Sequence, residues 1–196
     1  MIVKPVTLIG RAVRLEPLRR EHGERLYQAA QDPAIWPYMS YNPSVSFTAM
    51  QEWITEALEA QERGQQVPFV IVHLANEAII GSTRYLTIVP KDQGLEIGWT
   101  WLAREARRTS VNTECKYLLL RHAFEMLGAI RVQLKTDSRN LVSQRAIERL
   151  GASKEGVLRN HMIMPDGHYR HSVYYSILDT EWPTVKANLE AKMLLG

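Results

Sequence analysis

The chain has 196 residues, of which 45% are hydrophobic and 23% charged, and its net charge is +3. This length predicts a single domain over residues 1–196 that buries roughly 70% of its unfolded surface. The small net charge gives no argument for nucleic acid, and no apolar run approaches the ~20 residues that span a bilayer. A single cysteine, Cys115, excludes a disulfide framework, and the start lacks a signal-peptide pattern, so we expect a cytoplasmic protein without a membrane partner.

The first part of the chain predicts one strand followed by two helices. Branched residues that partly alternate indicate the strand at 6–18. Helices are predicted at 19–31 and 46–64, and Gly64 ends the second. Between the two helices, three prolines forbid regular structure, which predicts a loop over 32–44.

Three strands are predicted in succession at 66–74, 77–89 and 94–103. Short connections favour an antiparallel meander. A helix from about Asn112 to Leu127 then leads into the next strand, and this crossover makes the strands on either side parallel neighbours.

The remaining elements are a strand, a helix, two strands joined by a Pro-Asp-Gly turn, and a last helix. They are predicted at 129–136, 140–151, 155–164, 168–178 and 179–194. The predicted fold class is therefore α+β, with a mixed, mostly antiparallel central sheet of about seven strands flanked by helices.

The start of the helix at 112–127 has two interpretations. Free N–H groups and a partial positive charge suit a phosphate group, and Arg107 and Arg108 would add full charge beside them. Alternatively, Ser110 or Asn112 simply caps the helix and the arginines are solvated. The segment alone favours the ordinary cap, because capped helices outnumber anion sites.

The order of elements around this helix gives a wider pattern. The stretches "LEIGWTWL", "AREARRTSV", "NTECKYLLLRHAFEMLG", "IRVQLKT" and "DSRNLVSQRAIERLGA" resemble the GNAT N-acetyltransferases, most closely the RimJ/RimL branch. The resemblance covers nearly the whole chain. It implies transfer of acetyl from acetyl-CoA to a primary amine, by direct attack in a ternary complex. The acceptor would be a protein N-terminus or a small amine; no nucleic-acid partner is implied, and a homodimer stays open.

The family's pyrophosphate loop reads Q/R-x-x-G-x-G/A, and "RRTSVN" occupies it here. Arg107 matches the first position, whereas Ser110 and Asn112 stand in the two small-residue positions. Ser110 keeps its position small but adds a hydroxyl and restricts φ. The resemblance implies a cofactor-binding loop formed by Arg107, Arg108, Thr109, Ser110, Val111 and Asn112.

Glu96 is the candidate general base. It lies in "LEIGW", and strand alternation predicts that it faces away from Leu95, Ile97 and Trp99. An acceptor amine must lose a proton before it attacks, and a carboxylate can take this proton directly or through water. In many relatives a glutamate on this strand has this role. The alternative is a surface glutamate on a half-exposed sheet face.

Four further residues are implied for the acetyl and pantetheine parts of the cofactor. Backbone N–H groups near Trp101 and Leu102 would face the thioester where two strands splay, and would polarise its carbonyl. Asn140 and Ser143 share a helix face. Asn140 would contact the pantetheine or cap its helix. Ser143 would relay a proton to the thiolate, because this helix lacks the tyrosine that many GNAT enzymes use.

The residues that recognise the acceptor amine are expected in the loop at 32–44 and in the hairpin at 159–171. In the loop, Trp36, Tyr38 and Tyr41 either line a pocket or pin the loop to the core. His168 and His171 lie on opposite faces of a strand, so no metal is expected. Two other functions are compatible with parts of the sequence: a weakly active acyl-CoA sensor, suggested by Ser110 and the missing tyrosine, and a nucleic-acid-binding domain, suggested only by arginine-rich patches.

Overall fold

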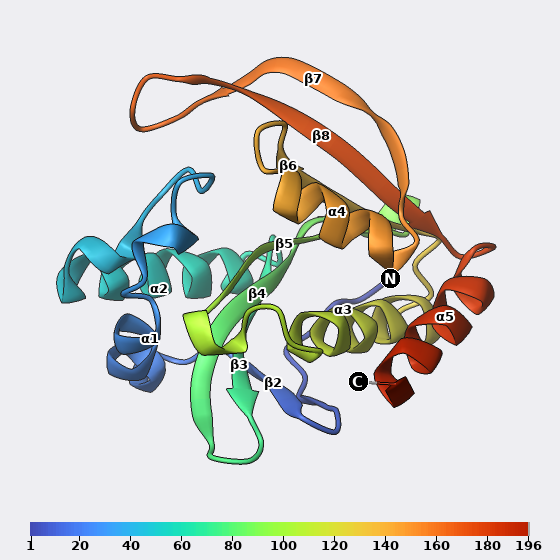
Figure 1. Cartoon of the computed structure of the whole chain (residues 1–196), viewed down its shortest axis with the longest axis horizontal. Helices are drawn as coiled ribbons and strands as arrows, with labels where there is room; N and C mark the ends of the chain where they lie inside the picture. Colours follow the sequence, from blue (N-terminus) through green and yellow to red (C-terminus); the bar gives the residue numbers. More distant parts are fainter. Residues whose placement is uncertain (196) are drawn as a thin grey trace.

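The computed structural model describes residues 1–195 and contains one mixed sheet of eight strands in the order β1-β2-β3-β4-β5-β6-β8-β7 (Figure 1). The strands are β1 (Leu8–Ile9), β2 (Val13–Pro17), β3 (Val67–His73), β4 (Ala78–Val89), β5 (Gly94–Leu102), β6 (Arg131–Asp137), β7 (Ser153–Ile163) and β8 (Tyr169–Leu178). All neighbouring pairs are antiparallel except β5 and β6, which are parallel. The predicted meander and the predicted crossover are both confirmed.

Five α-helices within the described residues accompany the sheet. They are α1 (Gly23–Ala29), α2 (Phe47–Glu62), α3 (Val111–Arg121), α4 (Leu141–Leu150) and α5 (Trp182–Leu195). Local signals in the sequence explain their ends. Ser46 caps α2 by accepting the Ala49 N–H at 3.0 Å, and Gly151 ends α4 with φ of 99°.

The sheet has eight strands where about seven were predicted, because the first predicted strand is a hairpin. The chain reverses after β1, where the Gly10 N–H donates to the Val13 carbonyl oxygen at 2.8 Å. The carboxylate of Glu114 on α3 accepts the next two backbone N–H groups, those of Arg11 and Ala12. A Cβ at Gly10 would overlap the Glu114 carboxylate, so a larger residue would have to displace this side chain from the turn. This turn depends on a residue far along the chain, so local alternation could not reveal it.

The helices cover the two faces of the sheet differently (Figure 1). A larger hydrophobic cluster joins α3, α4 and α5 to one face, through residues such as Ile97, Leu118 and Tyr175. A smaller cluster joins α1 and α2 to the other face, through residues such as Trp53 and Val70. Among the described residues, the smaller cluster contains none from β6, β7 or β8. That half of the second face therefore carries no helix from this part of the chain.

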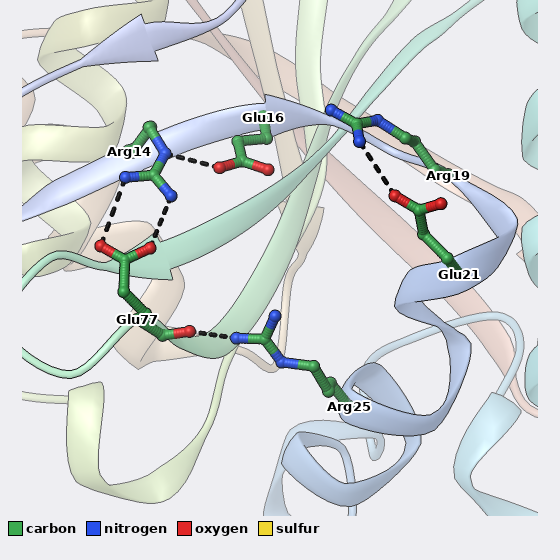
Figure 2. A network of polar contacts seen from close by, with 6 residues as sticks. All are labelled: Arg14, Glu16, Arg19, Glu21, Arg25 and Glu77. Carbon is green, nitrogen blue, oxygen red and sulfur yellow. Dashed lines mark hydrogen bonds and ion pairs between the residues drawn. The ribbon is translucent and has the colours of Figure 1, made fainter.

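Polar contacts connect α1 to the turn between β3 and β4 (Figure 2). Arg14 on β2 pairs with Glu16 and, at 2.7 Å, with Glu77 in the turn between β3 and β4. Arg25 on α1 donates to the backbone carbonyl of the same Glu77. Within the described chain, no helix is long and apolar enough to cross a membrane.

Candidate active site

The N-terminus of α3 is exposed and is not capped by a side chain in the usual way. Arg108 takes a left-handed conformation with φ of 61°, which turns the chain into the helix. Ser110 occupies the N-cap position, but in the described chain its side chain makes no capping hydrogen bond. Thr109 and Ser110 are both exposed. The Thr109 hydroxyl accepts the Val111 N–H at 3.3 Å, so the N–H groups of Asn112 and Thr113 are the ones that remain for an anion.

Arg107 is directed away from this turn and toward the predicted acceptor loop. It forms an ion pair with Asp32, the residue that begins the loop and caps its first turn through the Ala34 N–H. That N–H, and secondly the charge of Arg107, lower the pKa of Asp32 below its usual value. The first residue of the predicted cofactor loop therefore contacts the predicted acceptor loop.

A gap opens between β5 and β6 beside the start of α3. The two strands pair only from Gly94 with Arg131 to Glu96 with Gln133, and β5 continues without this partner. The Ala103 N–H points to β4, where it donates to the Ile80 carbonyl at 2.8 Å. Because successive N–H groups of a strand point to opposite sides, the Leu102 N–H is directed into the gap and the Trp101 N–H toward β4. Of the two predicted carbonyl-polarising donors, this alternation favours Leu102.

Glu96 is buried, with only 3% of its surface exposed, so it is not a residue of a half-exposed surface. Its Oε2 accepts from Gln133 Nε2 at 2.7 Å and from Thr87 Oγ1 at 3.5 Å. Its Oε1 lies 3.5 Å from Lys135 Nζ. A Cβ at Gly98 would stand 3.2 Å from Oε1, so the glycine leaves the space beside the carboxylate open. A buried carboxylate held by two neighbouring strands is well placed to accept a proton.

The prediction that Glu96 and Trp99 face opposite sides of the sheet was wrong. Trp99 has a left-handed φ of 50°, at a register shift between β4 and β5. The Arg84 guanidinium lies 4.3 Å from the Trp53 ring of α2 and 5.2 Å from the Trp99 ring. Trp99 therefore lies on the α2 side, as Glu96 does. Strand alternation fails here because the bulge inserts an extra residue.

The three predicted aromatic residues are not equivalent. Trp36 is 5% exposed, packs against Trp101 with ring centroids 5.6 Å apart, and donates its Nε1–H to the Ala30 carbonyl. Tyr38 is half-buried, and its ring lies 5.8 Å from the Arg139 guanidinium. Tyr41 is exposed. Trp36 pins the loop to the core, and the two tyrosines remain available to an acceptor.

Sequence reasoning missed a polar strip that runs from Glu96 across the part of the sheet without a helix. Gln133 and Lys135 lie on β6, and Tyr174 lies opposite Lys135 on β8. The Lys135 ammonium is 5.7 Å from the Tyr174 ring, and the Tyr174 hydroxyl is 3.4 Å from Nε2 of His161 on β7. Burial, and then the charges of Lys135 and Arg170, lower the pKa of His161. Gln133 and Lys135 alternate with the buried Val132 and Leu134, so the sequence could have placed them on the other face of the strand. Placing Tyr174 and His161 beside them required the register of β7 and β8.

Asn140 caps α4, since its Oδ1 accepts the Ser143 N–H at 3.0 Å. The Ser143 side chain is half-buried one turn into the helix. The capping hydrogen bond involves only the backbone N–H of Ser143, so the Ser143 hydroxyl takes no part in the cap. The two side chains can therefore be tested separately.

Asn140→Ala should lower stability by about 1 kcal/mol through loss of the cap and should raise KM for acetyl-CoA. Ser143→Ala keeps the cap, so its melting temperature should match that of the unmodified protein while kcat falls more than KM rises. Thermal unfolding and steady-state kinetics on both variants check this. A raised KM with unchanged kcat in Ser143→Ala would make Ser143 a binding residue.

Cys115 lies in the core, and burial raises the pKa of its thiol to about 12, so it is a packing residue. Within residues 1–195, no group of three His, Cys, Asp or Glu side chains is arranged to hold a metal ion.

The exposed helix start, the gap beside it and the buried carboxylate match a fold that transfers acyl groups. A family model described as an acetyltransferase (GNAT) domain matches residues 12–153. The chain belongs to the GNAT acetyltransferase family, and it is an N-acetyltransferase.

Individual relatives agree with this assignment. A structure from T. thermophilus, assigned as an acetyltransferase, is 40% identical, covers 98% of this chain and 99% of its own, and superposes with a TM-score of 0.88. YdaF of Bacillus subtilis (strain 168), provisionally named a ribosomal N-acetyltransferase, is 26% identical over 169 residues, which are 86% of this chain and 90% of YdaF. Mycobacterium smegmatis RimJ in complex with CoA-disulfide is 20% identical, with a TM-score of 0.84 and coverage of 96% and 95%, and shows the same fold.

Proposed function

We propose that this N-acetyltransferase uses acetyl-CoA as its acetyl donor and that a primary amine attacks the thioester directly in a ternary complex. The observation that carries the proposal is the exposed start of α3, where the Ser110 side chain makes no capping hydrogen bond, beside the gap between β5 and β6. A diphosphate fits such a helix start, and an extended thiol arm fits the gap. The RimJ structure, which contains CoA-disulfide, supports a CoA-based donor in this fold.

In this proposal the backbone of residues 107–112 binds the diphosphate, with Arg108 adding charge. The Leu102 N–H polarises the thioester carbonyl, since the Trp101 N–H points toward β4. Glu96 takes the proton of the acceptor amine through a water, because its own surface is only 3% exposed. Asn140 contacts the thiol arm, and Ser143 donates a hydrogen bond to the sulfur.

We further propose that the acceptor is the N-terminal amine of a protein. The sheet face over β6, β7 and β8 carries no helix from the described residues, which leaves room for an extended peptide beside Glu96. Tyr38 borders this face, because Arg170 on β8 donates to the Tyr38 carbonyl at 3.2 Å. The name of YdaF, a ribosomal N-acetyltransferase, points to the same class of acceptor.

A nucleic-acid partner is not proposed, because the arginine-rich patches make internal contacts. Arg19 pairs with Glu21 at 2.9 Å, Arg25 bonds to Glu77, and Arg107 pairs with Asp32 (Figure 2 for the first two). Paired arginines are poor phosphate neutralisers. We retain as proposals a single domain over residues 1–196, supported by one continuous sheet, and a cytoplasmic location, supported by the lone buried cysteine. A homodimer also stays a prediction.

Acetyl-CoA should stabilise the protein against heat. At 100 times its dissociation constant it should add about 2.7 kcal/mol to the free energy of unfolding, because it binds only the folded state. Differential scanning fluorimetry with acetyl-CoA and, as control, with acetylated cysteamine lacking the diphosphate checks this. An unchanged melting temperature at millimolar acetyl-CoA would contradict the proposed donor. Release of free CoA with a panel of amines and N-terminal peptides then identifies the acceptor.

A further inference from the structure

The departing thiolate of CoA needs a proton, and the residues assigned so far do not supply one. The Ser143 hydroxyl is a hydrogen-bond donor whose proton must be replaced as soon as it leaves. The first turn of α4 offers no acidic group besides it, since the helix reads LVSQRAIERL. Glu96 lies on the opposite face of the sheet and receives a proton in the same step. An ionisable proton donor on the α3 side of the gap would supply the proton that Ser143 can only relay.

Lys116 lies on that side. It is one helical turn after Asn112, so the two share a face of α3. Glu114 faces the other way, toward the turn between β1 and β2, where it accepts the Arg11 and Ala12 N–H groups. Lys116 is thus directed away from the β1–β2 edge and toward β5, and it is only 6% exposed.

The contact that Lys116 makes places its ammonium beside the unpaired part of β5. Its Nζ donates to Thr100 Oγ1, and this hydroxyl lies 2.8 Å from Thr83 Oγ1 on β4. Glu96 is the last β5 residue that pairs with β6, so Thr100, further along the strand, lies in the unpaired part of β5. The Lys116 ammonium therefore lies on the α3 side of the unpaired segment of β5 that ends at Leu102. The thioester is proposed to bind along this same segment.

The environment of Lys116 suits proton donation. No carboxylate among residues 1–195 lies within ion-pair distance of its Nζ, and Thr100 takes only one of three N–H donors. Burial lowers the pKa of Lys116 from 10.5 to about 8. The ionisable group beside it is the Cys115 thiol, which stays neutral because its own pKa is about 12. At neutral pH Lys116 is thus mostly protonated, yet it gives up its proton far more readily than an exposed lysine.

We propose that Lys116 is the general acid that protonates the departing CoA thiolate. This inference rests on the proposed binding of acetyl-CoA in the gap. The amine nitrogen bonds to the carbonyl carbon, the carbon–sulfur bond breaks with its electron pair on sulfur, and Lys116 transfers one proton to that sulfur. Glu96 takes the proton released by the amine. Neutral Lys116 then regains a proton from solvent before the next turnover.

Lys116→Met keeps the shape of the side chain and removes the proton. It should lower kcat by about 100-fold or more, with little change in the dissociation constant of CoA measured by calorimetry. The acid must be protonated to act, so kcat of the unmodified protein should fall as pH rises through about 8, and this alkaline limb should vanish in Lys116→Met. Lys116→Arg keeps the charge but is a much weaker acid, so it should not restore kcat.

A second measurement needs no turnover. The pKa of the CoA thiol bound to the protein, followed by the ultraviolet absorbance of the thiolate, should be about one unit or more higher in Lys116→Met, because the nearby ammonium favours the thiolate. Lys186→Met, which removes a surface lysine paired with Glu125 at 2.8 Å, is the matched control and should change neither quantity.

The outcomes separate the two proposals. If the unmodified protein neither binds CoA nor releases it from acetyl-CoA, the proposed donor fails and this inference fails with it. If the unmodified protein turns over normally but Lys116→Met keeps kcat, the alkaline limb and the thiol pKa, only the role of Lys116 is overturned. Full activity in Lys116→Arg would likewise overturn proton transfer, because a permanent charge would then suffice.

Discussion

Replacing Glu96 by glutamine should lower kcat by about 100- to 10,000-fold while the affinity for acetyl-CoA stays unchanged. Glutamine has the same shape and can still accept the hydrogen bond from Gln133, which reaches Oε2 at 2.7 Å. It cannot take a proton from the acceptor amine. Steady-state kinetics, with CoA affinity by calorimetry, measure both effects.

Glu114→Gln is the matched control, because Glu114 is also buried but lies on the other face of the sheet. It accepts two backbone N–H groups of the β1–β2 turn. Weakening these charge-assisted hydrogen bonds should lower stability by about 1 to 3 kcal/mol and leave kcat intact. An unchanged rate in Glu96→Gln would remove Glu96 from the mechanism and leave proton removal to water or to the substrate.

Ser110→Asp should raise KM for acetyl-CoA at least ten-fold and leave the melting temperature of the free protein nearly unchanged. If the start of α3 binds a diphosphate, the new carboxylate lies close to its charges. Like charges ~4 Å apart cost about 4 kcal/mol at an effective dielectric near 20, before salt and relaxation reduce the cost. A ten-fold change needs about 1.4 kcal/mol of this. The helix itself tolerates aspartate at this position, because the charge suits its dipole.

Two further variants of the same segment should change acetyl-CoA affinity in different directions. Arg108→Ala should weaken acetyl-CoA binding, whereas Ser110→Gly should leave it equal or tighter, because glycine removes the steric restriction. Initial-rate kinetics and thermal unfolding without ligand distinguish binding from folding effects. An active Ser110→Asp enzyme with unaltered acetyl-CoA affinity would show that this segment is an ordinary helix start.

Much of the site was visible in the sequence because it depends on neighbouring residues. The crossover from β5 through α3 to β6 follows from the hydrophobic periods and the glycine stops. Asn140 was predicted to cap its helix, and it does. The family resemblance then indicated where a CoA-binding loop would lie. The helix cap and the glycine stops depend on neighbouring residues, over which local conformation dominates, whereas the resemblance rests on the order of elements along nearly the whole chain.

Predictions that depended on contacts between distant segments were incomplete or wrong. The split of the first strand is stabilised by Glu114, which lies 103 positions from Arg11 along the chain. Trp99 changed sides of the sheet because a bulge against β4 interrupts alternation. The ion pair of Arg107 with Asp32 was not foreseen, and the role of Arg107 at a phosphate stays a prediction.

The sequence by itself determined the types of element, their order, the parallel crossover and the presence of Glu96 on a strand. Only the tertiary structure decided that Glu96 is buried between Gln133 and Lys135, and that Lys116 lies beneath the open part of β5. The physical reason is that the environment of an ionisable group is set by whichever chain segments surround it. Burial and charge act through space, and in this fold the partners of both residues come from other elements.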